Sequence, residues 1–244
     1  MSHTIAISGK GGSGKTTIAA LMVHALIGKS PQAVLAVDAD PNSCLGLTLG
    51  IEPENIVAEV REEAVAGTSK TAGTNRARSF EFGIQQAVTE AKGFDLLTMG
   101  RPEGPGCYCA ANNLLRKFLD DLSKSYGFVV IDNEAGMEHL SRRTTNNIEL
   151  LCIIAEATPL GAITAQRIFE LANKLPISIK QIGVLWNKVQ SPQQLDTIEN
   201  LGFIPYDESL YETLNRGKTV FDIQEDSPAF SAIKAVLSEK LEIE

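Results

Sequence analysis

The amino-acid sequence predicts a doubly wound α/β fold, with a mostly parallel sheet and helices on both of its faces. Short runs of β-branched and apolar residues recur along the 244-residue chain, and helix-like stretches separate them. The apolar runs are nearly continuous, as expected of parallel strands that are covered on both faces. The alternation of strand and helix implies right-handed crossovers between parallel strands. No internal repeat or linker divides the sequence, so a single domain is expected over residues 1–244.

The expected elements follow this alternation along the chain. Strands are predicted at Thr4–Ser8, Val34–Val37, Phe94–Met99, Phe128–Ile131, Leu150–Ala155 and Gln181–Trp186. Helices are predicted at Thr16–Gly28, Asn112–Ser125, Ala162–Leu175, Pro192–Leu201 and Pro228–Leu241. Ala66–Ser79 fits neither pattern, because it is small and polar with three basic residues and no acid, and we expect it to form a surface loop.

Composition and charge argue against several classes of function. The chain carries 22 basic and 30 acidic residues, a formal charge of −8, whereas a protein that binds DNA or anionic lipid needs a positive surface. Its longest apolar runs span six residues, far below the ~20 that cross a bilayer. Four cysteines in a chain of this length do not form a disulfide scaffold. We therefore expect a cytoplasmic protein with no nucleic-acid and no membrane partner.

A glycine-rich segment, Gly9–Thr16, follows the first predicted strand and opens the first predicted helix. It fits the phosphate-loop pattern G-x-x-x-x-G-K-[ST], and also the dinucleotide pattern G-x-G-x-x-G, with Asp38 and Asp40 downstream as candidate ribose ligands. Lys15 and Thr16 favour the phosphate loop. There the lysine reaches the β- and γ-phosphates and the hydroxyl binds Mg²⁺, whereas a dinucleotide fold has no use for either.

Two further residues extend the phosphate-loop interpretation. Asp132 follows four apolar residues at the end of a predicted strand, where it can hold the hydration shell of the magnesium ion. Lys10 is an additional lysine within the loop, placed to reach across a two-fold interface and neutralise charge as an arginine finger does elsewhere. Spacing alone leaves open the alternative that Lys10 is a solvated loop lysine.

Three segments together resemble the deviant Walker A ATPases, a group that includes the nitrogenase iron protein and the division-site and partition ATPases. The segments are Lys10–Thr17, Val37–Pro41 and Ile131–Gly136. The resemblance implies a P-loop NTPase that hydrolyses ATP with Mg²⁺, as an ATP-sandwich homodimer that closes with nucleotide and opens after hydrolysis.

The same resemblance implies roles for individual residues. Lys10 would act across the dimer, Asp40 would orient the attacking water, and Gly136 would sense the γ-phosphate. Asn187 would hydrogen-bond adenine, and Pro205–Asp207 would line the same pocket. The catalytic residues are thus expected to be Lys10, Lys15 and Asp40. The expected nucleotide-binding residues are Gly11, Gly12, Ser13, Gly14, Lys15, Thr16, Thr17, Asp132, Gly136 and Asn187.

Two closely spaced cysteines, Cys107 and Cys109, suggest half of a metal site. They follow Gly104–Gly106 and precede a predicted helix N-terminus, which favours thiolate. A closed tetrahedral site needs four ligands, and a two-fold axis through this loop would supply the other two. The alternative is a pair of buried or reducible thiols without metal. We expect zinc or nickel at a Cys-x-Cys site shared by the dimer.

With the Cys-x-Cys loop and the run Asp132–Arg143, the chain resembles the CooC family of nickel-maturation ATPases. The resemblance extends from Thr4 to about Lys188, although Ser13 stands where that family usually has valine. It implies a client nickel enzyme, carbon monoxide dehydrogenase or a relative, whose nickel–iron–sulfur cluster the ATPase helps to mature.

Three other functions compete with this interpretation. An iron–sulfur electron donor would carry a cysteine beside residues 133–136, and none is present there. An iron–sulfur carrier ATPase also bridges a dimer with paired cysteines, usually as Cys-x-x-Cys and further toward the C-terminus. A membrane-associated spatial regulator would need a basic amphipathic C-terminal helix, whereas Pro228–Glu244 is typical of a helix docked on the core.

Overall fold

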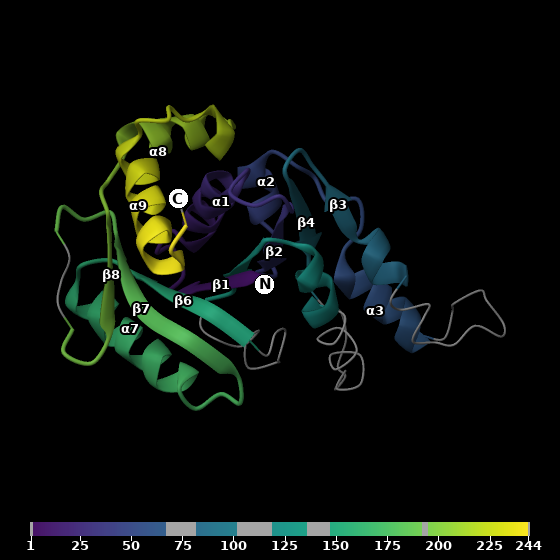
Figure 1. Ribbon diagram of the computed structural model, residues 1–244, viewed down its shortest axis with the longest axis horizontal. Coiled ribbons are helices and arrows are strands. Elements are labelled where there is room, and N and C mark those ends of the chain that lie inside the picture. Colours follow the sequence, from purple (N-terminus) through teal and green to yellow (C-terminus); the bar gives the residue numbers. More distant parts are fainter. Residues whose placement is uncertain (1, 67–81, 102–118, 136–146, 192–194, 244) are drawn as a thin grey trace.

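The chain folds around one eight-stranded sheet with strand order β3-β4-β2-β5-β1-β6-β7-β8 (Figure 1). This computed structural model describes residues 2–66, 82–101, 119–135, 147–191 and 195–243. The strands are β1 (His3–Gly9), β2 (Val34–Ala39), β3 (Val88–Glu90), β4 (Phe94–Thr98), β5 (Phe128–Asn133), β6 (Asn147–Ala155), β7 (Ser178–Asn187) and β8 (Glu199–Ile204). Only the β3–β4 pair is antiparallel among these strands. The predicted doubly wound α/β fold is confirmed.

Helices cover both faces of this sheet. They are α1 (Lys15–Leu26), α2 (Leu45–Leu49), α3 (Val57–Ala66), α7 (Pro159–Ala172), α8 (Glu208–Asn215) and α9 (Pro228–Leu241), with 3₁₀ turns η1 (Ser123–Ser125) and η2 (Val220–Asp222). Figure 1 shows α1 and α9 on one face and α7 on the other. Among the described residues, no helix is long and apolar enough to cross a membrane.

The alternation of side chains along each strand divides the core in two. In β1, Ile5 and Ile7 point into the cluster beneath α1 and α9, whereas Ala6 points into the cluster beneath α7. All three are fully buried, so the central strand is apolar on both faces, as parallel strands between two helical layers are. The sheet is therefore held rigidly from both sides, and the carboxyl ends of β1, β2, β5 and β7 share one edge.

The predicted helix at Pro192–Leu201 is wrong. Residues 192–194 lie outside the described ranges, Leu195 and Ile198 form an isolated antiparallel bridge, and Glu199 begins β8. The helical spacing of Leu195, Ile198 and Leu201 is misleading, because Ile198 packs into the core beneath α7 and Leu201 into the core beneath α9. Side chains that alternate between the two faces of a sheet are typical of extended chain, and the segment from Glu199 onward pairs with β7 as a strand.

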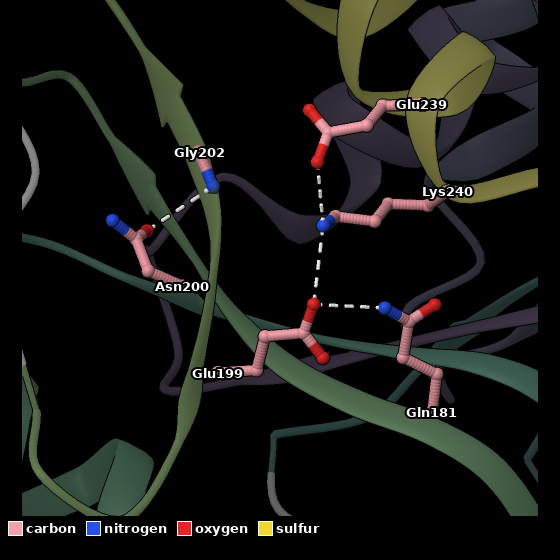
Figure 2. Close-up of polar contacts among 6 residues, drawn as sticks. All are labelled: Gln181, Glu199, Asn200, Gly202, Glu239 and Lys240. Carbon is pink, nitrogen blue, oxygen red and sulfur yellow. Dashed lines mark hydrogen bonds and ion pairs between the residues drawn. The ribbon is translucent and has the colours of Figure 1, made fainter.

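The edge strand β8 is fastened to α9 by polar contacts (Figure 2). Lys240 Nζ lies 3.1 Å from Glu199 Oε1, and Gln181 Nε2 on β7 donates to the same oxygen at 2.9 Å. The lysine side chain is only 12% exposed, so its aliphatic part packs against the protein while its charge reaches the carboxylate. This contact joins the sheet edge to the last helix and helps to hold the α9 side of the site described below.

The other predicted elements are confirmed to within a few residues where the structure describes them. The helix predicted at Asn112–Ser125 is described only from residue 119 onward, where residues 119–122 are helical and η1 follows. The loop predicted at Ala66–Ser79 lies outside the described residues except for Ala66, which ends α3. The short strand β3 was not expected, because three residues at a sheet edge give almost no periodic signal.

Candidate nucleotide-binding site

The phosphate loop connects β1 to α1 at the carboxyl edge of the sheet. Gly14 is the N-cap residue of α1, a 12-residue helix whose N-terminus has no side-chain cap. Gly14 has φ +95°, and a Cβ at this position would collide with the amide of Asn187. Glycine is therefore required both by the backbone conformation and by the close approach. The uncapped N–H groups of α1 remain available to an anion such as phosphate.

Lys15 is buried although it is charged, with 6% of its surface exposed. Its Nζ donates a long hydrogen bond of 3.4 Å to the Lys10 carbonyl, and no other hydrogen-bond partner is found within the described ranges, although Asp132 lies near enough to attract its charge. A buried ammonium with one weak partner is costly unless an anion neutralises it. The position of Lys15 at the N-terminus of α1 therefore fits a lysine that binds the phosphates of a nucleotide.

Asp132 lies beneath the phosphate loop, fully buried on β5. Neither of its carboxylate oxygens has a well-aligned hydrogen-bond partner in the part of the chain that the structure describes. Burial, helped by the charge of Asp38 on the neighbouring strand, raises the pKa of Asp132 to about 7 against the opposing effects of Thr16 and Lys15. An unpartnered buried carboxylate beside a threonine hydroxyl fits a hydrated Mg²⁺ ion, which uses few protein ligands.

Asp38 supports the neighbouring loop from the end of β2. Its Oδ2 accepts a hydrogen bond from the Leu45 N–H at 2.8 Å, and its Oδ1 accepts one from the Asp40 N–H at 3.2 Å. Burial raises the pKa of Asp38 to about 6 against the effect of these hydrogen bonds. Asp40 in turn accepts from the backbone and side-chain N–H groups of Asn42, at 2.9 and 2.8 Å. The expected catalytic carboxylate Asp40 is thus oriented by local hydrogen bonds.

The phosphate loop, with Lys15, Thr16 and Asp40, borders a cavity of about 550 Å³ at the carboxyl edge of the sheet. One end is formed by the phosphate loop with Asp40, Asn42 and Glu134. The other end is formed by Lys188, Pro205, Tyr206, Leu210, Tyr211 and Leu214. The cavity joins a region of N–H groups and an ammonium to a region of aromatic and aliphatic side chains. That combination matches a nucleotide, which is anionic at its phosphates and flat and largely apolar at its base.

Two asparagines form hydrogen bonds around the phosphate loop, one to the strand β1 that precedes it and one to the loop itself. Asn133, at the end of β5, donates through Nδ2 to the Ile7 carbonyl at 2.9 Å, and Asn187, at the end of β7, donates to the Ser13 carbonyl at 2.8 Å. Both residues are buried. Sequence reasoning assigned no role to Asn133 and did not anticipate either contact. Only its place directly after Asp132 could have drawn attention to it.

Asp207 organises the base side of the cavity, which it lines together with Pro205 and Tyr206, as the sequence resemblance implies. Its Oδ1 caps α8 by accepting from the Leu210 N–H at 3.1 Å, and its Oδ2 accepts from Ser227 Oγ at 2.6 Å and from the Ala229 N–H at 3.2 Å. These hydrogen bonds, with one from Ser209, hold the pKa of Asp207 at about 2 despite its burial. Sequence reasoning missed this organising role, although an aspartate immediately before a helical pattern is a helix-start signal.

Comparisons with known proteins agree with this site. The family model for the CobQ/CobB/MinD/ParA nucleotide binding domain matches residues 4–220. The chain belongs to this family. An uncharacterized ATP-binding protein of Methanocaldococcus jannaschii is 41% identical to the chain over 244 residues, which cover 95% of this chain and 96% of that protein. The domain is therefore a nucleotide-binding domain, and the predicted P-loop NTPase fold is confirmed.

Two further relatives define the breadth of the CobQ/CobB/MinD/ParA family around this chain. The carbon monoxide dehydrogenase accessory protein CooC of Rhodospirillum rubrum is 34% identical over 245 residues, covering 92% of this chain and 90% of that protein. The septum site-determining protein MinD of Pyrococcus horikoshii, solved with Mg-ADP, superposes with a TM-score of 0.69 at 22% identity and covers 98% of this chain and 96% of that chain. The latter likeness concerns the fold.

Most of the residues predicted for this family site come together in the structure. Those that line the main cavity are Gly11, Gly12, Gly14, Lys15, Thr16, Thr17, Asp40 and Asn187. Lys10 is exposed, and with Ser13 it borders a smaller cavity of about 80 Å³ beside Glu156 and the first turn of α7. Asp132 lies below the loop. The predicted γ-phosphate sensor Gly136 lies outside the described residues.

The predicted metal ligands Cys107 and Cys109 also lie outside the described residues. Within the described ranges, no group of three or more histidine, cysteine, aspartate or glutamate side chains could hold a metal ion. Cys152 is fully buried in β6, and burial raises the pKa of its thiol to about 12, as expected of a core cysteine. Cys44 is exposed near the carboxylates of the site, and burial and then the charge of Asp38 raise its pKa.

Proposed function

We propose that this chain is a Mg²⁺-dependent ATPase of the metallochaperone class. On this proposal it forms an ATP-sandwich homodimer and supports nickel insertion or maturation of the nickel–iron–sulfur cluster of carbon monoxide dehydrogenase or a related enzyme. The observation that carries the ATPase proposal is the unpartnered, buried Asp132 carboxylate beside Lys15 and Thr16. The observation that favours a nickel client is the 34% identity to CooC over nearly the whole chain. We expect a single cytoplasmic domain to perform this function.

Each site residue has a part in the proposed reaction. Lys15 and the N-terminus of α1 bind the phosphates, and Thr16 and Asp132 would hold Mg²⁺, which neutralises charge on the phosphate oxygens when bound. Asp40 orients the attacking water, while Lys10 of the second subunit stabilises the charge that develops on the transferred phosphoryl group. This arrangement explains why Lys15 and Asp132 are buried without well-aligned partners among the described residues.

Phosphate release from ATP tests the enzymatic part of the proposal. The wild-type chain is assayed with and without Mg²⁺, beside Lys15→Met, which keeps much of the side-chain volume and removes the charge. We expect Mg²⁺-dependent hydrolysis in the wild type and a loss of about 100-fold or more in the variant, because the lysine contacts the reacting phosphates. Absence of Mg²⁺-dependent hydrolysis in the wild type would exclude the ATPase proposal.

Metal titration tests the proposed dimer-shared site. We expect one Zn²⁺ or Ni²⁺ ion per dimer, bound by Cys107 and Cys109 of both subunits, since four thiolates complete a tetrahedral or square-planar set. The Cys107→Ser/Cys109→Ser double variant should lose this ion, and dimer mass followed in parallel should shift with metal in the wild type only. One tight ion per dimer in the double variant would place the site elsewhere.

An iron–sulfur carrier ATPase is the alternative, because paired cysteines across a dimer can also hold a cluster. The visible absorption spectrum of anaerobically purified protein separates the two, since a cluster absorbs strongly and zinc does not. The client is tested by activating nickel-free carbon monoxide dehydrogenase. Wild-type chain with ATP should lower the Ni²⁺ concentration needed, and Lys15→Met should not. Equal activation by both proteins would remove the proposed coupling to ATP.

A further inference from the structure

Asn187 has both ends of its side-chain amide engaged with the protein itself. Its Nδ2 donates to the Ser13 carbonyl at 2.8 Å, and its Oδ1 accepts from the Lys188 N–H at 2.9 Å. A carbonyl can only accept and an N–H can only donate, so these two partners fix the orientation of the amide. The residue is 7% exposed, so both hydrogen bonds are largely shielded from water. Breaking them is costly, because water cannot replace the lost partners.

The contact joins two segments that are 174 residues apart in sequence. β7 reaches β1 only through β6 in the sheet, whereas Asn187 bridges directly from the end of β7 to the phosphate loop. The peptide that it holds, Ser13–Gly14, immediately precedes Lys15 and the free N–H groups of α1. Asn187 also packs so closely on Gly14 that a Cβ there would collide with it.

We propose that Asn187 is a positioning residue for the phosphates of the nucleotide. By holding the Ser13 carbonyl, it sets the orientation of the Ser13–Gly14 peptide. That orientation determines how the α1 N-terminus and Lys15 face the phosphates. This inference rests on the proposed binding of ATP at the loop. It assigns Asn187 a task at the phosphate end of the cavity, in contrast to the recognition of adenine that sequence resemblance implies.

The base end of the cavity has surfaces of its own. Tyr206 and Tyr211 line it with ring centroids 6.4 Å apart, and each is more than half exposed. Aromatic rings can stack on a purine without reading its edge. A variant at Tyr206 therefore provides a matched control that acts on the base and leaves the phosphate loop intact.

The test compares the affinities of wild type, Asn187→Ala and Tyr206→Ala for inorganic tripolyphosphate, ATP, GTP and CTP. For Asn187→Ala we expect affinity to fall by a common factor of about five- to tenfold for all four ligands, the effect of one lost hydrogen bond. Tyr206→Ala should weaken the nucleotides and leave tripolyphosphate unchanged. A loss for Asn187→Ala that is confined to ATP, or no loss for any ligand, overturns the inference.

A second variant covers the case in which Asn187→Ala does not fold. Asn187→Asp keeps an oxygen for the Lys188 N–H but sets a carboxylate against the Ser13 carbonyl, so all four affinities should again fall together. Lowering the pH from about 8 to about 5 should restore part of the loss relative to wild type, because a protonated carboxyl group can donate to the carbonyl. No such recovery, with an unchanged tripolyphosphate affinity at both pH values, contradicts the proposed contact.

These outcomes also separate this inference from the proposed function. A wild-type chain that binds neither tripolyphosphate nor any nucleotide would overturn ATP binding and the inference together. If the wild-type chain binds them and Asn187→Ala loses affinity for ATP alone, the ATPase proposal stands. Asn187 then recognises adenine, as the sequence resemblance implies.

Discussion

The buried carboxylate of Asp132 should lower the stability of the nucleotide-free protein. Its carboxylate is fully buried without a well-aligned partner among the described residues. We expect Asp132→Asn to raise the free energy of unfolding of the nucleotide-free protein at pH 7 by about 1 kcal/mol, because it removes a carboxylate whose ionised form burial disfavours. The same variant should lose Mg²⁺-dependent hydrolysis. Urea unfolding and phosphate release measure the two effects.

The pH dependence of that stability provides an internal control. The pKa of Asp132 rises from an ordinary 3.8 to about 7 in the folded state, so the folded protein binds more protons than the unfolded chain between these values. The stability that Asp132 contributes by binding this proton is fully present below about pH 3.8 and is lost as the pH rises to about 7. The stability of wild type relative to Asp132→Asn should therefore decline between about pH 4 and about pH 7. Parallel slopes would contradict the raised pKa.

Asp40 should affect the reaction without affecting ligand binding. Asp40 borders the cavity, and the side-chain hydrogen bonds that it accepts come from Asn42, which lies outside the phosphate loop. We expect Asp40→Asn to bind ATP with wild-type affinity and to hydrolyse it about 100-fold more slowly or worse, because the loss falls on the transition state. Calorimetric titration and phosphate release give the comparison. Wild-type turnover in the variant would remove Asp40 from the mechanism.

Local spacing is enough to predict that Lys15, Thr16 and Asp132 lie together, because Lys15 and Thr16 follow the glycines directly and Asp132 ends an apolar run. The structure brings these three residues together, and their roles in the reaction stay predictions. The Asn187–Ser13 contact could not be predicted, because it depends on how β6 sets β7 beside the phosphate loop. Side chain–backbone contacts of this kind have no periodic signature.

Among the elements, sequence patterns predicted the buried strands well and the sheet edges poorly. β1, β2, β5 and β6 are covered on both faces, and their continuous apolar runs identify them. β8 lies at an edge, where Asn200 and Gly202 interrupt the apolar pattern and the pairing register shifts between Val184 and Leu185. A prediction from spacing alone therefore assigns Ile198 and Leu201 to one helix face, although they pack on opposite sides of the sheet.

The packing of α1 against η2 and α9 should make stability sensitive to acid through His24. This imidazole stacks on Phe230 at 4.4 Å and meets the edge of Phe221 at 4.9 Å, and its Nδ1 is buried without a partner within the described ranges. Burial lowers its pKa from the ordinary 6.5, against the effect of its hydrogen bond with Val220. The contribution of His24 to stability should thus be present above about pH 6.5 and be lost as the pH falls through its lowered pKa, because the unfolded chain binds the proton more readily.

His24→Phe provides the test of this acid sensitivity, since it preserves an aromatic ring between the two phenylalanines. Unfolding midpoints in urea at several pH values between about 5 and 8 should show a smaller acid-induced loss in His24→Phe than in wild type. His3→Gln is a control at a histidine outside this contact, because His3 stacks on Phe128 and pairs with Glu149. An identical acid-induced loss in wild type and His24→Phe would exclude His24 as the source.

The contact between β8 and α9 should contribute modestly to stability. Lys240→Met keeps the aliphatic packing and removes the charge that faces Glu199 (Figure 2). We expect a loss of about 0.5–1 kcal/mol, because the carboxylate is 43% exposed and solvent screens the pair. Arg216→Ala breaks the more exposed pair with Glu212 and should cost about 0.5 kcal/mol or less. Urea unfolding compares the two, and equal losses would show that the partial burial of Lys240 adds nothing.

At the scale of the whole molecule, the exposed position of Lys10 suggests how one subunit could complete the site of another. Lys15 fills the lysine position within the phosphate loop, whereas Lys10 borders the separate, smaller cavity beside the first turn of α7. An exposed cation at this edge can meet the phosphates of a nucleotide held by a second copy if the two phosphate loops face each other. The charge it supplies would then depend on dimer closure.

Lys10→Ala should therefore separate nucleotide binding from assembly. We expect the variant to bind a non-hydrolysable ATP analogue about as tightly as the wild type, because Lys15 and the α1 N-terminus remain. It should nevertheless lose ATP-dependent dimerisation and at least about 100-fold of hydrolysis together, since a transition-state charge contributed from the second subunit disappears. Sedimentation velocity with the analogue and phosphate release report the two effects. Lys10→Arg serves as the matched control, because it keeps the charge and should retain dimerisation even where the altered geometry slows turnover. Normal dimerisation and hydrolysis in Lys10→Ala would make Lys10 a solvated loop lysine, and the site of each subunit would then be complete without its partner.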